Sequence, residues 1–151
     1  MPVGWRIVKE KHVSVAFSGE GAAKAGGRWN SRGVAVVYTS ASKSLAALET
    51  IVHLNPPVLF KYKIIRIEFA DELVEKISTA ILPRDWRAEP PPPSTKWIGD
   101  AWVRESRCAI LAVPSVIISD EINYMLNPAH LDFKKVVIGE PEDFAFDPRL
   151  L

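Results

Sequence analysis

A glycine-rich segment near the start of the chain carries residue types that could bind an anion. In Gly26-Gly27-Arg28-Trp29-Asn30, paired glycines let backbone N–H groups approach a ligand closely, and the Arg28 guanidinium offers a rigid fork of donors suited to phosphate oxygens. Gly27 and Arg28 are therefore candidate ligands of a phosphate or diphosphate. A tight turn with a solvated arginine is the alternative, and the pattern alone leaves it open.

Glu49 is the candidate for acid chemistry. The apolar residues Leu45, Leu48 and Val52 recur at helical spacing in the segment 42–53, and Glu49 falls on the same face. A carboxylate is rarely placed there unless it is paired or functional, because desolvating an ion costs several kcal/mol. The pattern favours a catalytic carboxylate facing a cleft over a structural ion pair with an arginine.

Tyr38 and Ser115 each stand at the end of an apolar strand candidate. Tyr38 could stack on a planar ring in a cleft, although the pattern alone favours packing in the core. The Ser115 hydroxyl could hydrogen-bond a ligand, but the glycine-flanked elbow of hydrolase serines is missing, so Ser115 is not expected to be a nucleophile. A turn-forming serine is the simpler interpretation of Ser115.

The elements that must position these residues follow from periodicity and capping. We expect strands at 5–8, 34–39, 58–69, 108–113, 116–118 and 135–138. Helices are expected at 42–53, capped by Ser40 or Ser42 and stopped by the asparagine and prolines at 55–57, and at 94–104. The segment 16–33 holds five of the eight glycines and predicts a loop.

The order of these elements predicts a single domain spanning residues 1–151. Its class is α+β, with a mixed, mostly antiparallel β core and a few short helices. The proline run at 90–93 resembles a linker, but only a short stretch with further strands follows it. We therefore expect the run to be an extended surface loop of the same domain.

The balance of charge excludes several classes of partner. The chain has 19 basic and 18 acidic side chains, so no global field attracts nucleic acid or an anionic membrane. Neither a secretory apolar region nor a run approaching about 18 apolar residues is present, which predicts a soluble cytoplasmic protein. Direct nucleic-acid binding is not expected.

The remaining reactive side chains indicate neither metal nor thiol chemistry. His12, His53 and His130 are scattered without the spacing of metal ligands, so no metal is expected. Cys108 lies in an apolar run and is expected to be a buried, inert thiol. Glycine motifs of Rossmann and P-loop nucleotide sites are also missing.

Taken in order, these motifs resemble the RES domain. The resemblance rests on Gly-Gly-Arg-Trp-Asn at 26–30, Tyr38, Ala-Leu-Glu-Thr at 47–50, Pro-Ser at 114–115 and Asn-Tyr-Met-Leu-Asn-Pro at 123–128. That family is named for an arginine, a glutamate and a serine. By their position in the motifs, these match Arg28, Glu49 and Ser115.

The resemblance implies an ADP-ribosyltransferase-like fold and NAD as the substrate. It implies a toxin of a bacterial toxin–antitoxin pair that cleaves the nicotinamide–ribose bond by phosphorolysis or hydrolysis. Arg28 and Glu49 would be catalytic, and Gly27, Tyr38, Ser115 and Asn127 would help to bind the substrate. The implied partners are inorganic phosphate and an Xre-like antitoxin.

Other functions stay open at this stage. An ADP-ribosyltransferase that modifies a protein would use the same motifs, because its acceptor comes from outside them. A non-catalytic protein-binding module would explain the glycine-rich segment, but gives no reason for Glu49 on an apolar face. Exposed aromatic surface at Trp97 and Trp102 would favour a homodimer.

Overall fold

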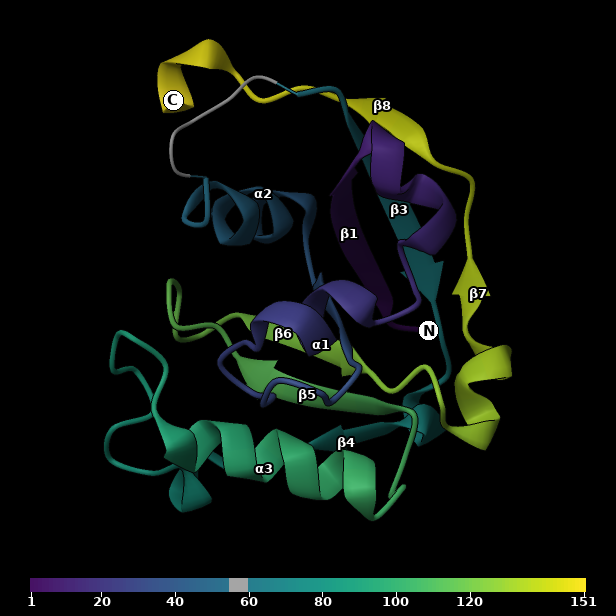
Figure 1. Ribbon diagram of the computed structural model, residues 1–151. Helices are drawn as coiled ribbons and strands as arrows, with labels where there is room; N and C mark the ends of the chain where they lie inside the picture. Colours follow the sequence, from purple (N-terminus) through teal and green to yellow (C-terminus); the bar gives the residue numbers. More distant parts are fainter. Residues whose placement is uncertain (55–59) are drawn as a thin grey trace.

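The computed structural model describes residues 1–54 and 60–151, and within them eight strands form one curled sheet (Figure 1). The strands are β1 (Val3–Lys9), β2 (Val37–Ser40), β3 (Tyr62–Glu68), β4 (Val74–Lys76), β5 (Ile110–Pro114), β6 (Ile122–Leu126), β7 (Val137–Ile138) and β8 (Glu142–Phe144). Their order is β4-β5-β6-β2-β1-β3-β7, with β8 also paired to β3. Only the pairing of β4 with β5 is parallel among these strands. The predicted α+β class with a mostly antiparallel sheet is confirmed.

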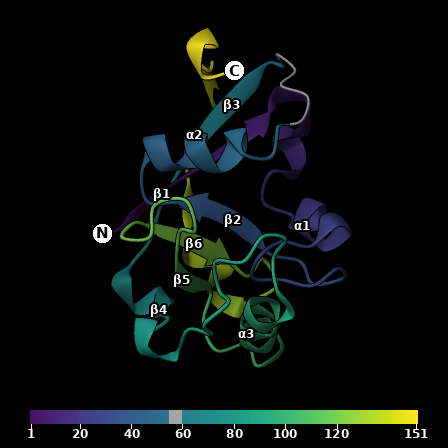
Figure 2. The same cartoon turned by 90° about the vertical axis from the view of Figure 1, so that its left-hand side faces the viewer.

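Three α-helices flank the described part of this sheet: α1 (Glu20–Ala25), α2 (Lys43–Ile51) and α3 (Pro93–Arg104). Short 3-10 turns complete the chain at Glu10–Val15, Asp71–Leu73, Thr79–Ile81, Leu131–Lys135 and Pro148–Leu150. Of the two predicted caps of α2, Ser42 is the one used, since its hydroxyl accepts a hydrogen bond from the N–H of Leu45 at 3.1 Å. Both views place α2 beside β1 and β2, and α3 beside β5 (Figures 1 and 2).

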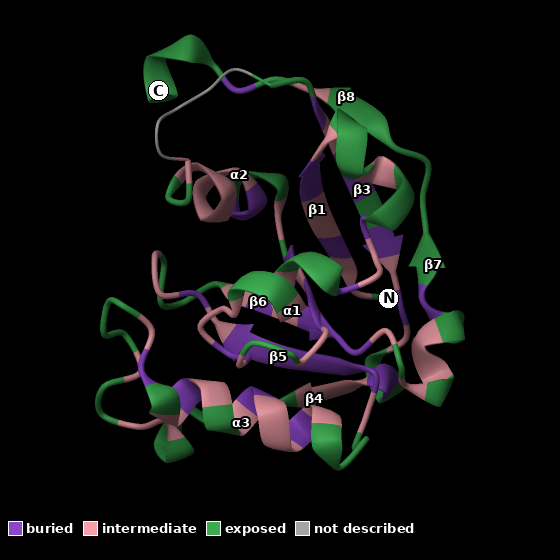
Figure 3. Ribbon diagram, viewed as in Figure 1, coloured by how far each residue is buried: buried purple, intermediate pink, exposed green. Residues whose placement is uncertain are grey.

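Helix α3 is held against the sheet by Trp102. This side chain is fully buried in a cluster with Leu111 and Val113 of β5 and Met125 of β6, and β5 is buried along nearly its whole length (Figure 3). The expectation that Trp102 is exposed is wrong, because it lies on the sheet-facing side of α3. Trp97, on the other side of the helix, is exposed as expected.

Some segments differ from the sequence prediction for identifiable reasons. The predicted loop 16–33 contains α1, which is built from alanines and bounded by Gly19 and Gly26, whose φ angles are 79° and 71°. Residues 122–126 form β6, a strand that is not among those predicted, and a turn follows from Asn127. The predicted strand 116–118 is instead a turn, because the Ser115 hydroxyl accepts hydrogen bonds from the N–H groups of Ile117 and Ile118.

The predicted apolar stripe of α2 is only partly correct. Leu45 is buried, but Val52 is 57% exposed and lies just past the last helical residue. Ala46 takes a buried position instead. The predicted helix stop at 55–57 and the first residues of the strand predicted from 58 lie outside the described residues. In the described part of the chain, no helix has the length and apolar character that crossing a bilayer requires.

We predict that Gly99→Ala lowers the free energy of unfolding by at least about 1–3 kcal/mol. An added Cβ would lie 1.7 Å from the carbonyl oxygen of Trp29, so α3 would have to move away from the 26–30 turn. Urea unfolding followed by tryptophan fluorescence measures the loss.

Gly21→Ala is the matched control for this prediction. It lies in α1, and its added Cβ would meet nothing within 4 Å. Its stability should stay the same or rise by up to about 1 kcal/mol, as alanine is the better helix former. Equal unfolding midpoints for Gly99→Ala and the unsubstituted protein would contradict the close approach of α3.

Candidate active site

The Glu49 carboxylate lies on α2 and reaches the ends of two strands of the sheet. Its Oε1 accepts hydrogen bonds from Ser115 Oγ at 2.7 Å and from Asn123 Nδ2 at 2.9 Å. Among the described residues, no hydrogen bond reaches Oε2. The carboxylate is therefore fixed through one oxygen, and the other is available to a ligand.

The groups that hold Glu49 are themselves held. Ser115 is fully buried, and its oxygen accepts two backbone N–H bonds at 3.1 Å while its hydroxyl donates to Glu49. The Oδ1 of Asn123 accepts a hydrogen bond from Ser40 Oγ at 2.7 Å, which leaves Nδ2 to point at Glu49. The pairing of Ser40 with Asn123 across β2 and β6 sets this arrangement. Such second contacts orient a functional side chain.

The Arg28 guanidinium is hydrogen-bonded to the segment 82–92, which we call the proline loop. Arg28 Nη1 donates to the carbonyl oxygens of Trp86 at 3.0 Å and Ala88 at 2.7 Å. Nη2 donates to Glu89 Oε2 at 2.6 Å, and the pair is an ion pair. The alternative of a solvated arginine is wrong, since the Arg28 side chain is only 12% exposed.

The start of α3 fixes the backbone of the turn that carries Arg28. Thr95 Oγ1 donates to the carbonyl oxygen of Arg28 at 2.7 Å, and Lys96 Nζ binds that of Gly27 at 2.6 Å. The turn closes by a bond from the Gly27 N–H to the Asn30 carbonyl oxygen at 3.0 Å. The glycine-rich segment therefore forms a turn, and its carbonyl oxygens accept hydrogen bonds from side chains of α3.

Gly27 is required by the approach of Tyr38. A Cβ at position 27 would lie 2.7 Å from the Tyr38 hydroxyl and 2.8 Å from Asn30 Oδ1. That hydroxyl donates to Asn30 Oδ1 at 2.6 Å and accepts from the Trp29 N–H at 3.1 Å. The structure thus brings together Gly27 and Tyr38.

The pKa of the Tyr38 hydroxyl is affected by the charges of both the arginine and the glutamate. Burial raises this pKa well above the ordinary value, the charges of Asp100 and Glu49 raise it further, and the Trp29 N–H and the Arg28 charge oppose the shift. Tyr38 is thus close enough to Arg28 and Glu49 to sense both charges. Its hydroxyl stays protonated near neutral pH and keeps its role as a donor.

The proline loop joins the arginine end of the site to the serine end. While its carbonyls bind Arg28, Arg87 Nη2 donates to the carbonyl oxygen of Val116 at 3.0 Å. Val116 directly follows Ser115, which binds Glu49. The loop therefore spans from Arg28 to the turn that holds the catalytic candidate.

Arg6 is a buried cation bound to the main chain of Tyr38, and the sequence pattern did not single it out. It lies on β1, and its guanidinium donates to the carbonyl oxygens of Ala16 at 2.6 Å and Tyr38 at 2.9 Å. Burial lowers its pKa to about 10, and no ion pair joins it to a carboxylate within residues 1–54 and 60–151. A buried cation without a counter-charge is costly, which suits an anionic ligand. An arginine inside an apolar strand segment was the available signal.

Asn127 lies away from this group of residues. It follows the last residue of β6, whereas Asn123 lies near the first. Its Oδ1 accepts a hydrogen bond from the Ala129 N–H at 3.0 Å, and its own N–H donates to the Ala109 carbonyl at 2.8 Å. The side chain thus stabilises a turn, and the structure does not bring it to Glu49.

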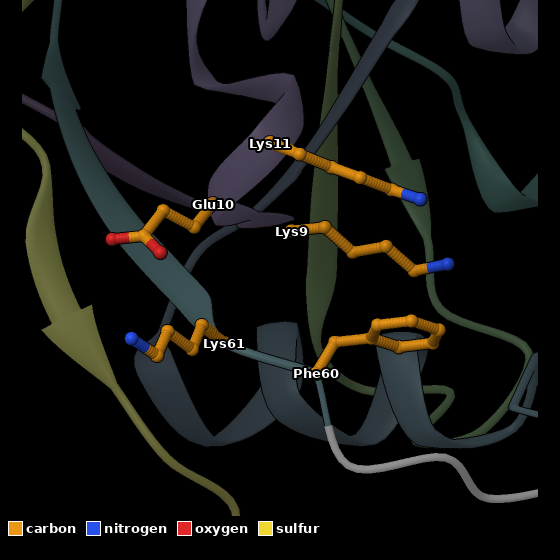
Figure 4. Close-up of a pocket in the computed structure, with 5 residues that line it drawn as sticks. All are labelled: Lys9, Glu10, Lys11, Phe60 and Lys61. Atoms are coloured by element: carbon orange, nitrogen blue, oxygen red, sulfur yellow. The ribbon is translucent and has the colours of Figure 1, made fainter.

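A hollow of about 150 Å³ lies elsewhere on the surface, at the end of β1 (Figure 4). Lys9 Nζ sits 4.0 Å from the centre of the Phe60 ring there. None of the predicted site residues lines it; its lining is Lys9, Glu10, Lys11, Phe60 and Lys61. Within the described residues, no three His, Cys, Asp or Glu side chains are grouped as metal ligands.

Comparison with known proteins identifies the family to which this chain belongs. Residues 3–147 match the RES domain family. The chain is 40% identical to the Prs ADP-ribosylating toxin of Sphingobium sp. (strain YBL2), over 97% of this chain and 95% of that protein. It is 37% identical to Toxin Res of Yersinia enterocolitica, over 97% of both chains.

A solved structure has the same fold. A chain of the M. tuberculosis MbcT–MbcA toxin–antitoxin complex superimposes with a TM-score of 0.77 at 16% identity, over 95% of this chain and 84% of that chain. The fold of this chain is thus shared with a chain of that complex. The chain belongs to the RES-domain toxin family.

We predict that Ser115→Ala lowers the free energy of unfolding by about 1–3 kcal/mol, since it leaves the N–H groups of Ile117 and Ile118 without their partner. Thermal or urea unfolding measures the effect. Ser119→Ala, on the exposed part of the same turn, should change stability by less than about 0.5 kcal/mol. Equal losses in the two variants would show that the buried hydroxyl has no special structural role.

Proposed function

We propose that the protein is a toxin that degrades NAD by breaking the nicotinamide–ribose bond. The observation that carries the proposal is the Glu49 carboxylate, half-buried, held by Ser115 and Asn123 through Oε1 and open at Oε2. A fixed negative charge of this kind stabilises positive charge that develops on a sugar. Membership of the RES family supports a sugar–nucleotide substrate for it.

The reaction needs only one carboxylate. As the bond between ribose C1′ and the nicotinamide nitrogen breaks, its electron pair returns to the pyridinium ring, which leaves as neutral nicotinamide. No general acid is needed, unlike in most O-glycoside hydrolysis. Glu49 Oε2 accepts hydrogen bonds from the ribose hydroxyls and stabilises the oxocarbenium-like sugar. An oxygen of phosphate or water then bonds to C1′ and gives up its proton to the solvent.

Two cations are available for the diphosphate of NAD. Arg28 offers Nη2 at the edge of the proline loop, and Arg6 supplies a buried positive charge without a carboxylate partner among the described residues. Tyr38, which senses the charges of both Arg28 and Glu49, stacks on the nicotinamide ring. Ser115 positions Glu49 rather than attacking the substrate.

A second candidate function is ADP-ribosylation of a protein. The name of the Sphingobium relative, Prs ADP-ribosylating toxin, favours this possibility. Bond cleavage at Glu49 is the same in both cases, and only the acceptor differs. Adenine-labelled NAD incubated with the purified protein distinguishes them: small labelled products that depend on phosphate or water support degradation, and label on a protein of an added lysate supports transfer.

An antitoxin is the proposed protein partner. The structural neighbour comes from a toxin–antitoxin complex, which supports a partner of that kind for this chain. An antitoxin that covers the proline loop and Glu49 would block access to Oε2. Co-expression with the product of a neighbouring gene tests the partner, because a true antitoxin would copurify and stop nicotinamide release.

We predict that Glu49→Gln lowers the rate of nicotinamide release by about 10²–10³-fold, the scale of losing one preorganised electrostatic contact. The amide keeps the shape of the side chain but removes its negative charge. Release is measured by chromatography of the products formed from NAD.

Glu72→Gln is the control, because Glu72 is exposed in the turn Asp71–Leu73, away from the proposed site. Its rate should match that of the unsubstituted protein. Undiminished turnover in Glu49→Gln would reject the assignment of Glu49. If no active preparation releases nicotinamide or labels a protein, the non-catalytic binding module becomes the better explanation.

A further inference from the structure

The proline loop places a carboxylate on the arginine to which the proposed function assigns phosphate binding. Glu89 Oε2 lies 2.6 Å from Arg28 Nη2. A carboxylate and a phosphate oxygen form the same charge-assisted hydrogen bonds with a guanidinium. The two groups therefore compete for the same N–H donors.

The two partners are unequally exposed. The Arg28 side chain is 12% exposed, whereas that of Glu89 is 74% exposed. Among the described residues, the Glu89 carboxylate has no hydrogen bond other than that from Arg28. Exposed ion pairs of this kind are weak, because water solvates the freed carboxylate well. The arginine is thus fixed, and its carboxylate partner can leave at little cost.

The other arm of Arg28 does not depend on Glu89. Nη1 donates to the main-chain carbonyls of Trp86 and Ala88, and these bonds fix the plane of the guanidinium. Exchange of one anion for another on Nη2 therefore requires no movement of the arginine. Only the Glu89 side chain has to turn into the solvent.

We propose that Glu89 determines the affinity of this site for phosphate-bearing ligands, by occupying Arg28 Nη2 until a phosphate oxygen displaces it. The inference rests on the proposed function, because it takes Arg28 as a ligand of the NAD diphosphate. Glu89 acts through Arg28 and is not a catalytic residue. Its removal leaves Nη2 open and strengthens binding, while the carboxylate chemistry at Glu49 stays the same.

Isothermal titration calorimetry with NAD and with inorganic pyrophosphate tests the competition. All proteins carry Glu49→Gln, so that NAD consumption during the titration is slowed by the predicted factor of about 10²–10³. In this background, Glu89→Gln should lower the Kd of both ligands about two- to fivefold at low salt, the range expected for loss of an exposed ion pair. The difference should shrink as ionic strength rises.

A double-substitution cycle shows whether Glu89 acts through Arg28. In Arg28→Ala protein, or Arg28→Gln protein if the first does not fold, Glu89→Gln should leave both Kd values unchanged. The matched control is Glu105→Gln, which removes a carboxylate from the exposed Arg107 pair and should alter neither Kd. In protein with Glu49 intact, Glu89→Gln should lower KM and leave kcat unchanged.

The possible outcomes separate this inference from the proposed function. Equal Kd values with and without Glu89→Gln overturn the competition, as does the same gain in the absence of the Arg28 guanidinium. If neither ligand binds the parent protein, the inference and the phosphate-binding role of Arg28 both fail. If pyrophosphate follows the expected pattern but NAD does not bind, the competition is upheld and NAD as substrate is rejected.

Discussion

The site depends on a carboxylate being held by two neutral donors that share one of its oxygens. Ser115 and Asn123 both donate to Glu49 Oε1, so the negative charge is oriented without being neutralised by a cation. A salt bridge would have fixed the same side chain more strongly, but would have consumed the charge that a developing cation needs. The buried Ser115 and the β2–β6 pairing that places Asn123 thus hold the carboxylate and leave its negative charge intact.

The cations form no ion pair with Glu49 among the described residues, so the positive and negative groups can act on different parts of a ligand. Arg6 and Arg28 are each bound mainly by main-chain carbonyls, which orient a guanidinium but cancel none of its charge. The charges of Arg28 and Glu49 act in opposite directions on the pKa of the Tyr38 hydroxyl, and burial keeps that hydroxyl protonated. The proposed dinucleotide substrate carries a negative diphosphate and develops positive charge on its ribose, so it would use both kinds of charge.

Local chemistry in the sequence predicted the α+β class and the cap of α2, because capping and periodicity act over a few residues. The contacts that complete the site could not be predicted, since they join residues far apart in the chain, as Glu49 with Asn123 and Arg28 with Glu89. Strand β6 was not predicted, because the bond from Ser40 that makes Asn123 acceptable in a strand is invisible in a linear pattern.

The proline loop binds Arg28 through main-chain carbonyls at Trp86 and Ala88, and through a side chain only at Glu89. Main-chain carbonyls are present whatever residue stands at a position. The outer side chains of this loop are therefore free to diverge between related toxins without loosening its hold on the arginine. Substitutions of these outer side chains would change which antitoxin the loop fits, while the residues beneath the loop stay the same.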